Sequence, residues 1–230
     1  MRSGSLTVRS VIDAVEAALR DQVLDQEIPV GSAVRETEVA RVFDVARPTA
    51  KAAIERLVAT GLLTRDVHRS ARVPTLSADD VSDLYLSRTI LEAGVVRRLA
   101  ASRSLPAAAM ATIESMKALG SGALPKQYVA PDIEFHAVLA AHVGSRRVGQ
   151  MHAALMQQMQ LCMAQVQAHH LLSPGIIVAE HERILAAIRD GAPEVAAREL
   201  EQHLERARSV LVEFLADDSE AASPDVTARR

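Results

Sequence analysis

Tryptophan is absent from this sequence of 230 residues, which contains only three phenylalanines and two tyrosines. A core with so few aromatic residues, and with abundant alanine, leucine and valine, is typical of helices and not of strands. Hydrophobic residues nevertheless make up 49% of the chain, which is enough for a substantial core. The composition therefore predicts a mainly α-helical globular protein.

Cysteine and long apolar runs are also scarce. Cys162 is the single cysteine, so the chain has no internal disulfide framework. No segment approaches the roughly 18 apolar residues that a membrane span requires. The first residues do not combine a basic start, an apolar run and a cleavage site, as a secretion signal would. We therefore expect a cytoplasmic protein that does not have a membrane as a partner.

The charge of the chain is unevenly distributed. The formal net charge is -3, but residues 41–72 contain seven lysines and arginines against three acidic residues. A basic segment in an acidic chain is expected where a protein contacts phosphate groups. A solvated helix surface has the same composition, so charge alone leaves both interpretations open.

The N-terminal part of the chain has the pattern of a DNA-binding fold. Apolar residues at helical spacing predict helices over residues 8–27, 35–43 and 47–60. Pro48 suits the first turn of the third helix, and Gly61 follows its end. Two extended pieces on either side of residues 67–70 predict a β-hairpin. Helix, turn, helix and hairpin together indicate a winged helix-turn-helix domain.

In that geometry the second helix of the motif lies in the major groove of DNA, where its first residues reach the base edges. Arg47 is placed to bind guanine, Thr49 to contact a phosphate or a base, and Lys51 to contact a phosphate. Arg35 and Arg69 complete the set of candidate DNA contacts. We therefore predict that double-stranded DNA is a partner.

Residues 74–80 predict a boundary between two domains, because Pro74 breaks the chain and Ser77 can cap a following helix. We expect a winged helix-turn-helix domain over residues 1–75, an all-helical antiparallel bundle over 76–216 and a disordered tail over 217–230. The helices expected in the bundle cover residues 78–102, 106–118, 131–142, 146–169, 175–190 and 193–216.

Four side chains of the second domain have the spacing of a metal site. Asp132 and His136 are four residues apart and share one helix face. His181 and His203 each lie about 14–15 Å from the short connection between their two helices, so antiparallel packing brings them together. One carboxylate and three imidazoles suit Zn²⁺, which we favour, or Ni²⁺. The spacing leaves open that each histidine is simply a packed core residue.

The segment PVGSAVRETEVARVFDVARPTAKAAIERLVATGLL, residues 29–63, resembles the DNA-binding domain of the GntR family of bacterial regulators. The family usually has Ser, Arg, Thr, Pro, Val and Arg where residues 46–51 read Ala, Arg, Pro, Thr, Ala and Lys. Ala46 cannot cap the recognition helix, a loss of about 1 kcal/mol. Lys51 replaces an arginine that could bind bidentately. We therefore expect an operator that differs from the family's commonest one.

Residues 79–212 resemble the helical FCD effector domain of the FadR branch of that family. The resemblance is carried by the motifs around Arg88 and Glu92, around Asp132 and His136, and by the sequence EHERILAAI and a final His-Leu pair. It implies that Asp132, His136, His181 and His203 are metal ligands. It also implies that the protein is a homodimer.

These features predict a DNA-binding transcriptional regulator, expected to be a repressor, whose operator binding responds to a small organic acid held at the metal. Arg88 is the candidate second anchor for the effector, and a surface pair with Glu92 is the alternative. A metal-dependent hydrolase with Glu134 or Glu180 as its base, and a direct metal sensor, are the competing functions. The basic N-terminal module and the lack of an HExxH motif favour a protein that is not an enzyme.

Overall fold

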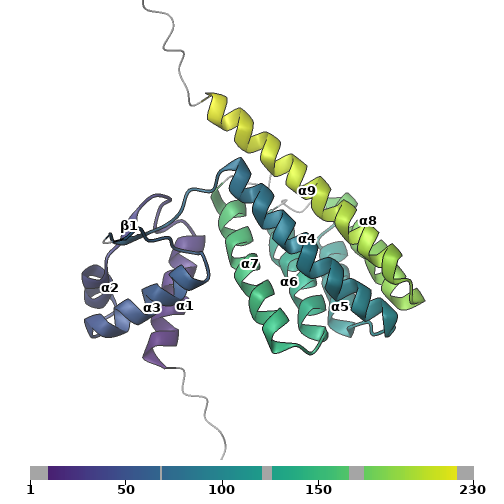
Figure 1. Ribbon diagram of the computed structural model, residues 1–230, viewed down its shortest axis with the longest axis horizontal. Helices are drawn as coiled ribbons and strands as arrows, with labels where there is room; N and C mark the ends of the chain where they lie inside the picture. The colour runs from purple at the N-terminus through teal and green to yellow at the C-terminus, as the bar shows by residue number, and fades with distance from the viewer. Residues whose placement is uncertain (1–9, 68, 121–125, 166–173, 222–230) are drawn as a thin grey trace, which may run out of the picture. The chain divides into compact units, whose positions relative to one another are not determined.

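The computed structural model describes residues 10–67, 69–120, 126–165 and 174–221 (Figure 1). The chain divides into two compact units, Met1–Thr75 and Leu76–Arg230. Helices make up most of the described residues in both units, and the only sheet found there has two short antiparallel strands. The prediction of a mainly helical protein is confirmed.

The N-terminal unit is a three-helix domain with a small sheet. Both α1 and α2 pack against α3, and Leu19 of α1 and Ile54 and Leu57 of α3 are buried. The elements are α1 (Val11–Leu24), β1 (Ala33–Val34), α2 (Glu36–Val42), α3 (Arg47–Ala59) and β2 (Ala71–Arg72).

The turn between α2 and α3 follows from local sequence. Asp44 adopts a φ of 49°, a left-handed conformation that aspartate tolerates better than most residues. Ala46 is the N-cap of α3 and makes no side-chain capping bond, while a proline occupies the first turn. After α3, Gly61 has a φ of 76°, which ends the helix. The predicted start and end of the recognition helix are thus observed.

The expected β-hairpin is only partly correct. Thr64 and Arg72 exchange two backbone hydrogen bonds of 2.8 Å, but they form an isolated bridge. The ladder partner of β2 is β1, with Ala33 opposite Arg72 and Val34 opposite Ala71. Val34 and Ala71 are both buried in the core of the unit. Their burial as a cross-strand pair favours the pairing of β1 with β2.

The C-terminal unit is a bundle of six helices among the described residues. Its central helix is α4, which packs against α6, α7, α8 and α9, and Figure 1 shows α4 and α9 side by side. Phe135, Ile184 and Leu200 are fully buried in the core. The helices are α4 (Ala78–Ala101), α5 (Ala107–Leu119), α6 (Lys126–His142), α7 (Arg146–Gln165), α8 (Pro174–Asp190) and α9 (Pro193–Ala221).

The first helix of the bundle begins as the sequence predicts. Ser77 accepts a hydrogen bond from the Asp80 backbone, and the Asp80 carboxylate accepts one from the Ser77 backbone at 2.8 Å. Such a capping box typically stabilises a helix by about 1 kcal/mol. No helix in the described ranges combines the length and the apolar character that crossing a membrane requires.

Several helix boundaries differ from the prediction. The helix α1 covers Val11–Leu24, not residues 8–27, because Ser10 caps its start and Asp25 ends it.

Two further differences are in the bundle. The helix α6 begins at Lys126, not at residue 131, and Pro131 lies inside it. The added turns are anchored by buried Tyr128, whose hydroxyl donates to the Gly120 carbonyl at 2.8 Å. The helix α9 continues to Ala221, so the expected tail does not start at residue 217. Residues 166–169 and 222–230 lie outside the described residues.

Candidate functional site

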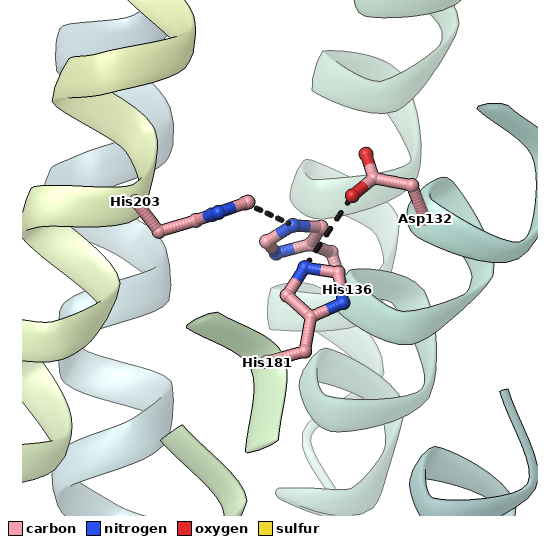
Figure 2. A group of neighbouring side chains, drawn as sticks. All are labelled: Asp132, His136, His181 and His203. Atoms are coloured by element: carbon pink, nitrogen blue, oxygen red, sulfur yellow. Dashed lines mark hydrogen bonds and ion pairs between the residues drawn. The ribbon is translucent and has the colours of Figure 1, made fainter. Parts of the chain in front are cut away.

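Four side chains from three helices of the bundle converge on one point (Figure 2). Asp132 and His136 come from α6, His181 from α8 and His203 from α9, and their ligand atoms all lie within 4.8 Å of one another. The Nε2 atoms of His136 and His203 are 3.2 Å apart. Nε2 of His181 is 3.3 Å from Oδ1 of Asp132. The structure therefore brings together all four residues that the sequence indicated as ligands.

The three imidazoles are buried, and burial favours their neutral form. His181 has no exposed surface, and its ring stacks on Phe135 with centroids 3.7 Å apart. Burial lowers the pKa of His136 and His203 below the usual value, and it lowers the pKa of His181 well below it. Burial raises the pKa of Asp132. A neutral imidazole has one nitrogen lone pair, which is the form that binds a metal.

Two glutamates set the orientation of the histidine rings. Nδ1 of His203 donates to Oε2 of Glu180 at 2.8 Å, and Nδ1 of His136 lies 2.7 Å from Oε2 of Glu92 without the angle of a hydrogen bond. A proton held on Nδ1 leaves the lone pair of a neutral imidazole on Nε2. The two Nε2 atoms that face each other therefore both carry lone pairs. A cation between the two Nε2 atoms binds both lone pairs. A hydrogen bond between them cannot form, because neither Nε2 carries a proton.

Two distances within the cluster fit a divalent metal. Two atoms that each bind Zn²⁺ at roughly 2.0–2.1 Å, at angles of 90–110°, lie roughly 2.9–3.4 Å apart. The His136–His203 and Asp132–His181 distances of 3.2 and 3.3 Å fall in that range. Among the described residues, Oδ1 of Asp132 and both ring nitrogens of His181 are buried without a hydrogen-bond partner. Buried polar atoms of this kind are normally satisfied, so the donor set suits an ion.

A cavity of about 50 Å³ lies beside the cluster, and Asp132, His136 and His203 form part of its wall. Arg88 also lines this cavity. Its Nε donates to Oε1 of Glu92 at 2.9 Å, and both side chains are only 4% exposed. The pair is therefore buried, which corrects the alternative of a surface pair: Arg88 pairs with Glu92 and faces the cavity.

Arg206 and His152 belong to this region and were not predicted from the sequence. Arg206 lines the cavity and donates to both oxygens of Glu180, at 2.8 and 2.6 Å. Although burial acts in the opposite direction, hydrogen bonds from His203 and Arg206 lower the pKa of Glu180 to about 2. His152 is buried, with Nε2 3.4 Å from Glu92. The signal for Arg206 was its position three residues after His203, on the same helix face.

The residues expected to contact DNA lie in the N-terminal unit. Arg47 is the first residue of α3, its side chain is 68% exposed and its Nε donates to Glu36 at 3.1 Å. Arg35, Arg47 and Arg69 line one surface hollow of about 290 Å³. Thr49 is half-buried and Lys51 exposed on α3, outside the lining of this hollow.

Several cations of the basic segment are paired within the N-terminal unit. Arg56 donates to Asp13 at 2.6 Å and to Glu16 at 3.2 Å, both on α1. Arg65 is hydrogen-bonded to Glu55. Arg72 donates to the Gly31 carbonyl at 3.1 Å. The charge available to DNA is thus smaller than the composition of residues 41–72 indicates.

Each of the two units matches a known protein family. Residues 11–73 match the family described as bacterial regulatory proteins, gntR family, and residues 83–206 match the FCD domain. The HTH-type transcriptional repressor NanR of Klebsiella aerogenes is 30% identical over 227 residues, covering 89% of this chain and 86% of the relative.

A second relative is named "Probable D-xylose utilization operon transcriptional repressor" and comes from Paenarthrobacter nicotinovorans. It is 26% identical over 204 residues, covering 88% of this chain and 89% of the relative. A crystal structure of a GntR regulator from Rhodococcus sp. RHA1 has a TM-score of 0.72 at 21% identity, covering 89% of this chain and 99% of the other. That structure supports the fold.

The gntR match is to regulatory proteins, and both curated relatives are named as transcriptional repressors, so the prediction of a transcriptional regulator is confirmed. The match of the FCD domain to more than half of the chain also confirms the predicted domain type. This chain belongs to the gntR family of bacterial regulatory proteins and carries an FCD domain.

Proposed function

We propose that this protein is a transcriptional repressor that binds operator DNA as a homodimer in the cytoplasm. A small carboxylate bound at a divalent metal in the bundle changes its affinity for that operator. The names of the two curated relatives, both repressors, support the first part. The facing Nε2 atoms of His136 and His203 carry the second part; Glu180 is hydrogen-bonded to the His203 ring and Glu92 lies beside the His136 ring.

The metal would be held by Asp132, His136, His181 and His203. Three nitrogen ligands and one oxygen ligand favour Zn²⁺, with Ni²⁺ as the alternative. When bound, the ion supplies a positive centre that attracts the carboxylate of the effector. Arg88 is the second anchor, because it lines the cavity and uses only Nε to bind Glu92.

DNA would be bound by the hollow that Arg35, Arg47 and Arg69 line, together with Thr49 and Lys51 on α3. Arg47 stands at the N-terminus of the recognition helix, where a side chain reaches the base edges. Glu36 holds the Arg47 side chain through Nε, so its terminal nitrogens can address a guanine. The other arginines contact the phosphates.

Dimerisation is supported by the surface of α4. Leu86 and Ile90 are 57% and 71% exposed and lie four residues apart, so they form an apolar strip on one helix face. A two-fold dimer would place two recognition helices on half-sites roughly 34–36 Å apart, or a multiple of this. Exchanging Ile90 for Asp should shift the protein from dimer to monomer in analytical ultracentrifugation.

The proposal is tested by measuring DNA binding while metal and acid are varied independently. The operator is selected from random duplexes with the purified protein, and its affinity is followed by fluorescence anisotropy. We expect metal-loaded protein to change its operator affinity about 5- to 150-fold on adding a small carboxylate, the usual range of allosteric coupling. If metal alone produces the whole change and no acid adds to it, the protein is a direct metal sensor.

Replacement of His203 by alanine separates the two parts of the proposal. This variant should lose bound metal, as measured by elemental analysis, and should lose the response to acid. It should keep operator binding, because the N-terminal unit is untouched. An unaltered metal content in His203→Ala would show that the cluster is not the metal site.

A further inference from the structure

Most of the cavity wall beside the metal cluster is apolar. Apart from the metal ligands, only Tyr85, Arg88 and Arg206 present polar side chains among the described residues that line it. Tyr85 is buried, and burial raises the pKa of its hydroxyl. The remaining wall is aliphatic or thioether and includes Ile133, Met156, Met159, Met163, Ile177 and Leu211.

The charges around the cavity sum to a single positive charge once the site holds a divalent ion. Arg88 is paired with Glu92, and Arg206 is paired with Glu180, so these four groups cancel. Asp132 neutralises half of the charge of the ion, and the three histidines carry no charge, because imidazole binds a metal in its neutral form. The single positive charge can therefore neutralise one negative charge on a ligand. A second negative charge on the ligand would remain unpaired.

The size of the cavity limits the ligand to a few atoms. Its volume is about 50 Å³. A buried water occupies roughly 10–15 Å³ on this measure, so the space is equivalent to about three to five waters. Methionine side chains are flexible, so Met156, Met159 and Met163 can adjust to small differences in shape. The cavity thus suits a short ligand with an apolar tail.

We propose that the effector is a short aliphatic monocarboxylate of about three to six carbons without hydroxyl groups on its tail. This inference rests on the proposed function, because the carboxylate faces the metal and Arg88. The tail packs among the methionines and Ile133, Ile177 and Leu211. Each methylene that the wall buries raises the affinity about fourfold.

Sugar acids and dicarboxylates fit the cavity less well. A sugar acid brings several hydroxyls into a wall where Tyr85 offers the one neutral hydroxyl among the described lining residues. Each hydroxyl left without a hydrogen bond weakens binding roughly 5- to 150-fold. A dicarboxylate places its second charge against methionine and isoleucine. Polarity and charge therefore select the ligand, more than length does.

Isothermal titration calorimetry of the full-length, zinc-loaded protein tests the inference. The panel consists of acetate, butyrate, isovalerate, succinate and gluconate, with the zinc content of each sample measured beforehand. We expect affinity to rise about fourfold per methylene from acetate to butyrate. Butyrate and isovalerate should bind at least about tenfold more tightly than succinate and gluconate.

Two variants on α7 locate the binding of the tail. Met159→Gln places a polar group in the cavity wall, whereas Met151→Gln changes an exposed residue of the same helix. The first should weaken butyrate binding about tenfold, leave acetate binding unchanged and keep the zinc. The second should resemble the unmodified protein in all three measurements. If both variants changed butyrate affinity equally, the tail would not bind beside Met159 and this part of the inference would be overturned.

The outcomes separate this inference from the function on which it rests. Tighter binding of gluconate or succinate than of butyrate, in zinc-loaded protein, overturns the inference and leaves the proposed function intact. Binding of none of the five acids to protein with full zinc content overturns the inference and the carboxylate effector together. If the protein does not bind zinc, the charge balance fails. Both the inference and the proposed metal site are then overturned.

Discussion

Replacing His181 by alanine should remove most of the stability that the protein gains from metal. An ion present at 100 times its dissociation constant stabilises the native state by about 2.7 kcal/mol. For a unit of this length, Leu76–Arg230, each kcal/mol changes Tm by about 2–4 °C. The unmodified protein should therefore gain roughly 5–11 °C in Tm when zinc is added to chelator-treated protein.

The variant should gain far less, because it lacks one of four ligands. Loss of a group that merely orients a ligand weakens metal binding about 10- to 100-fold, and loss of a ligand is at least as severe. With a site 100-fold weaker, the same zinc concentration stabilises by only about 0.4 kcal/mol, or roughly 1–2 °C. His181 lies fully buried against Phe135.

Differential scanning fluorimetry of EDTA-treated protein, titrated with zinc, measures both shifts. His142→Ala is the matched control, since His142 is an exposed histidine that is hydrogen-bonded to Ser104. This control should keep the full zinc-dependent shift. Comparing the shifts with and without zinc cancels any change in the stability of the metal-free variant. A zinc-dependent shift above about 5 °C in His181→Ala would refute the four-ligand site.

Glu180→Gln should weaken zinc binding about 10- to 100-fold in a competition assay with a chromophoric chelator, because Glu180 orients His203. Glu182→Gln, a change to an exposed neighbour on the same helix, should leave zinc affinity unaltered, and equal effects would contradict the orienting role. Arg47→Ala should weaken operator binding about 5- to 150-fold and relax specificity, whereas retained specificity would show that Arg47 does not read bases. Cys162 is buried, and burial raises the pKa of its thiol to about 12, so the thiol stays protonated at pH 8. It should react with a disulfide reagent only as the protein unfolds in urea, and rapid reaction of the native protein would contradict its burial.

Local interactions in this protein were predictable from the sequence. The capping of α4 by Ser77 and Asp80 involves residues three apart, and so does not depend on the rest of the chain. The lack of a side-chain cap at Ala46 and the end of α3 before Gly61 are equally local. Such features follow from the chemistry of one turn of helix, and the structure agrees with each of them.

Boundaries that depend on packing between helices were predicted less well. Pro131 indicated the start of α6, yet Tyr128 reaches the Gly120 carbonyl and holds the earlier residues in the helix. The helix α9 also runs past the expected end at residue 216, to Ala221, although the apolar residues that pack on the core end at Leu215. A proline inside the helix removes one backbone hydrogen bond, and burial of apolar surface such as Tyr128 outweighs that loss.

The sequence by itself determined which residues could form the site. The spacing of Asp132 and His136 places them on one helix face, and the short turn after α8 brings His181 and His203 to the same height. Only the tertiary structure decided their surroundings: Glu92 and Glu180 orient the rings, Arg88 is buried beside its glutamate, and Arg206 completes the cavity. Helical periodicity fixes neighbours within one helix, whereas partners on other helices depend on how side-chain volumes pack between them.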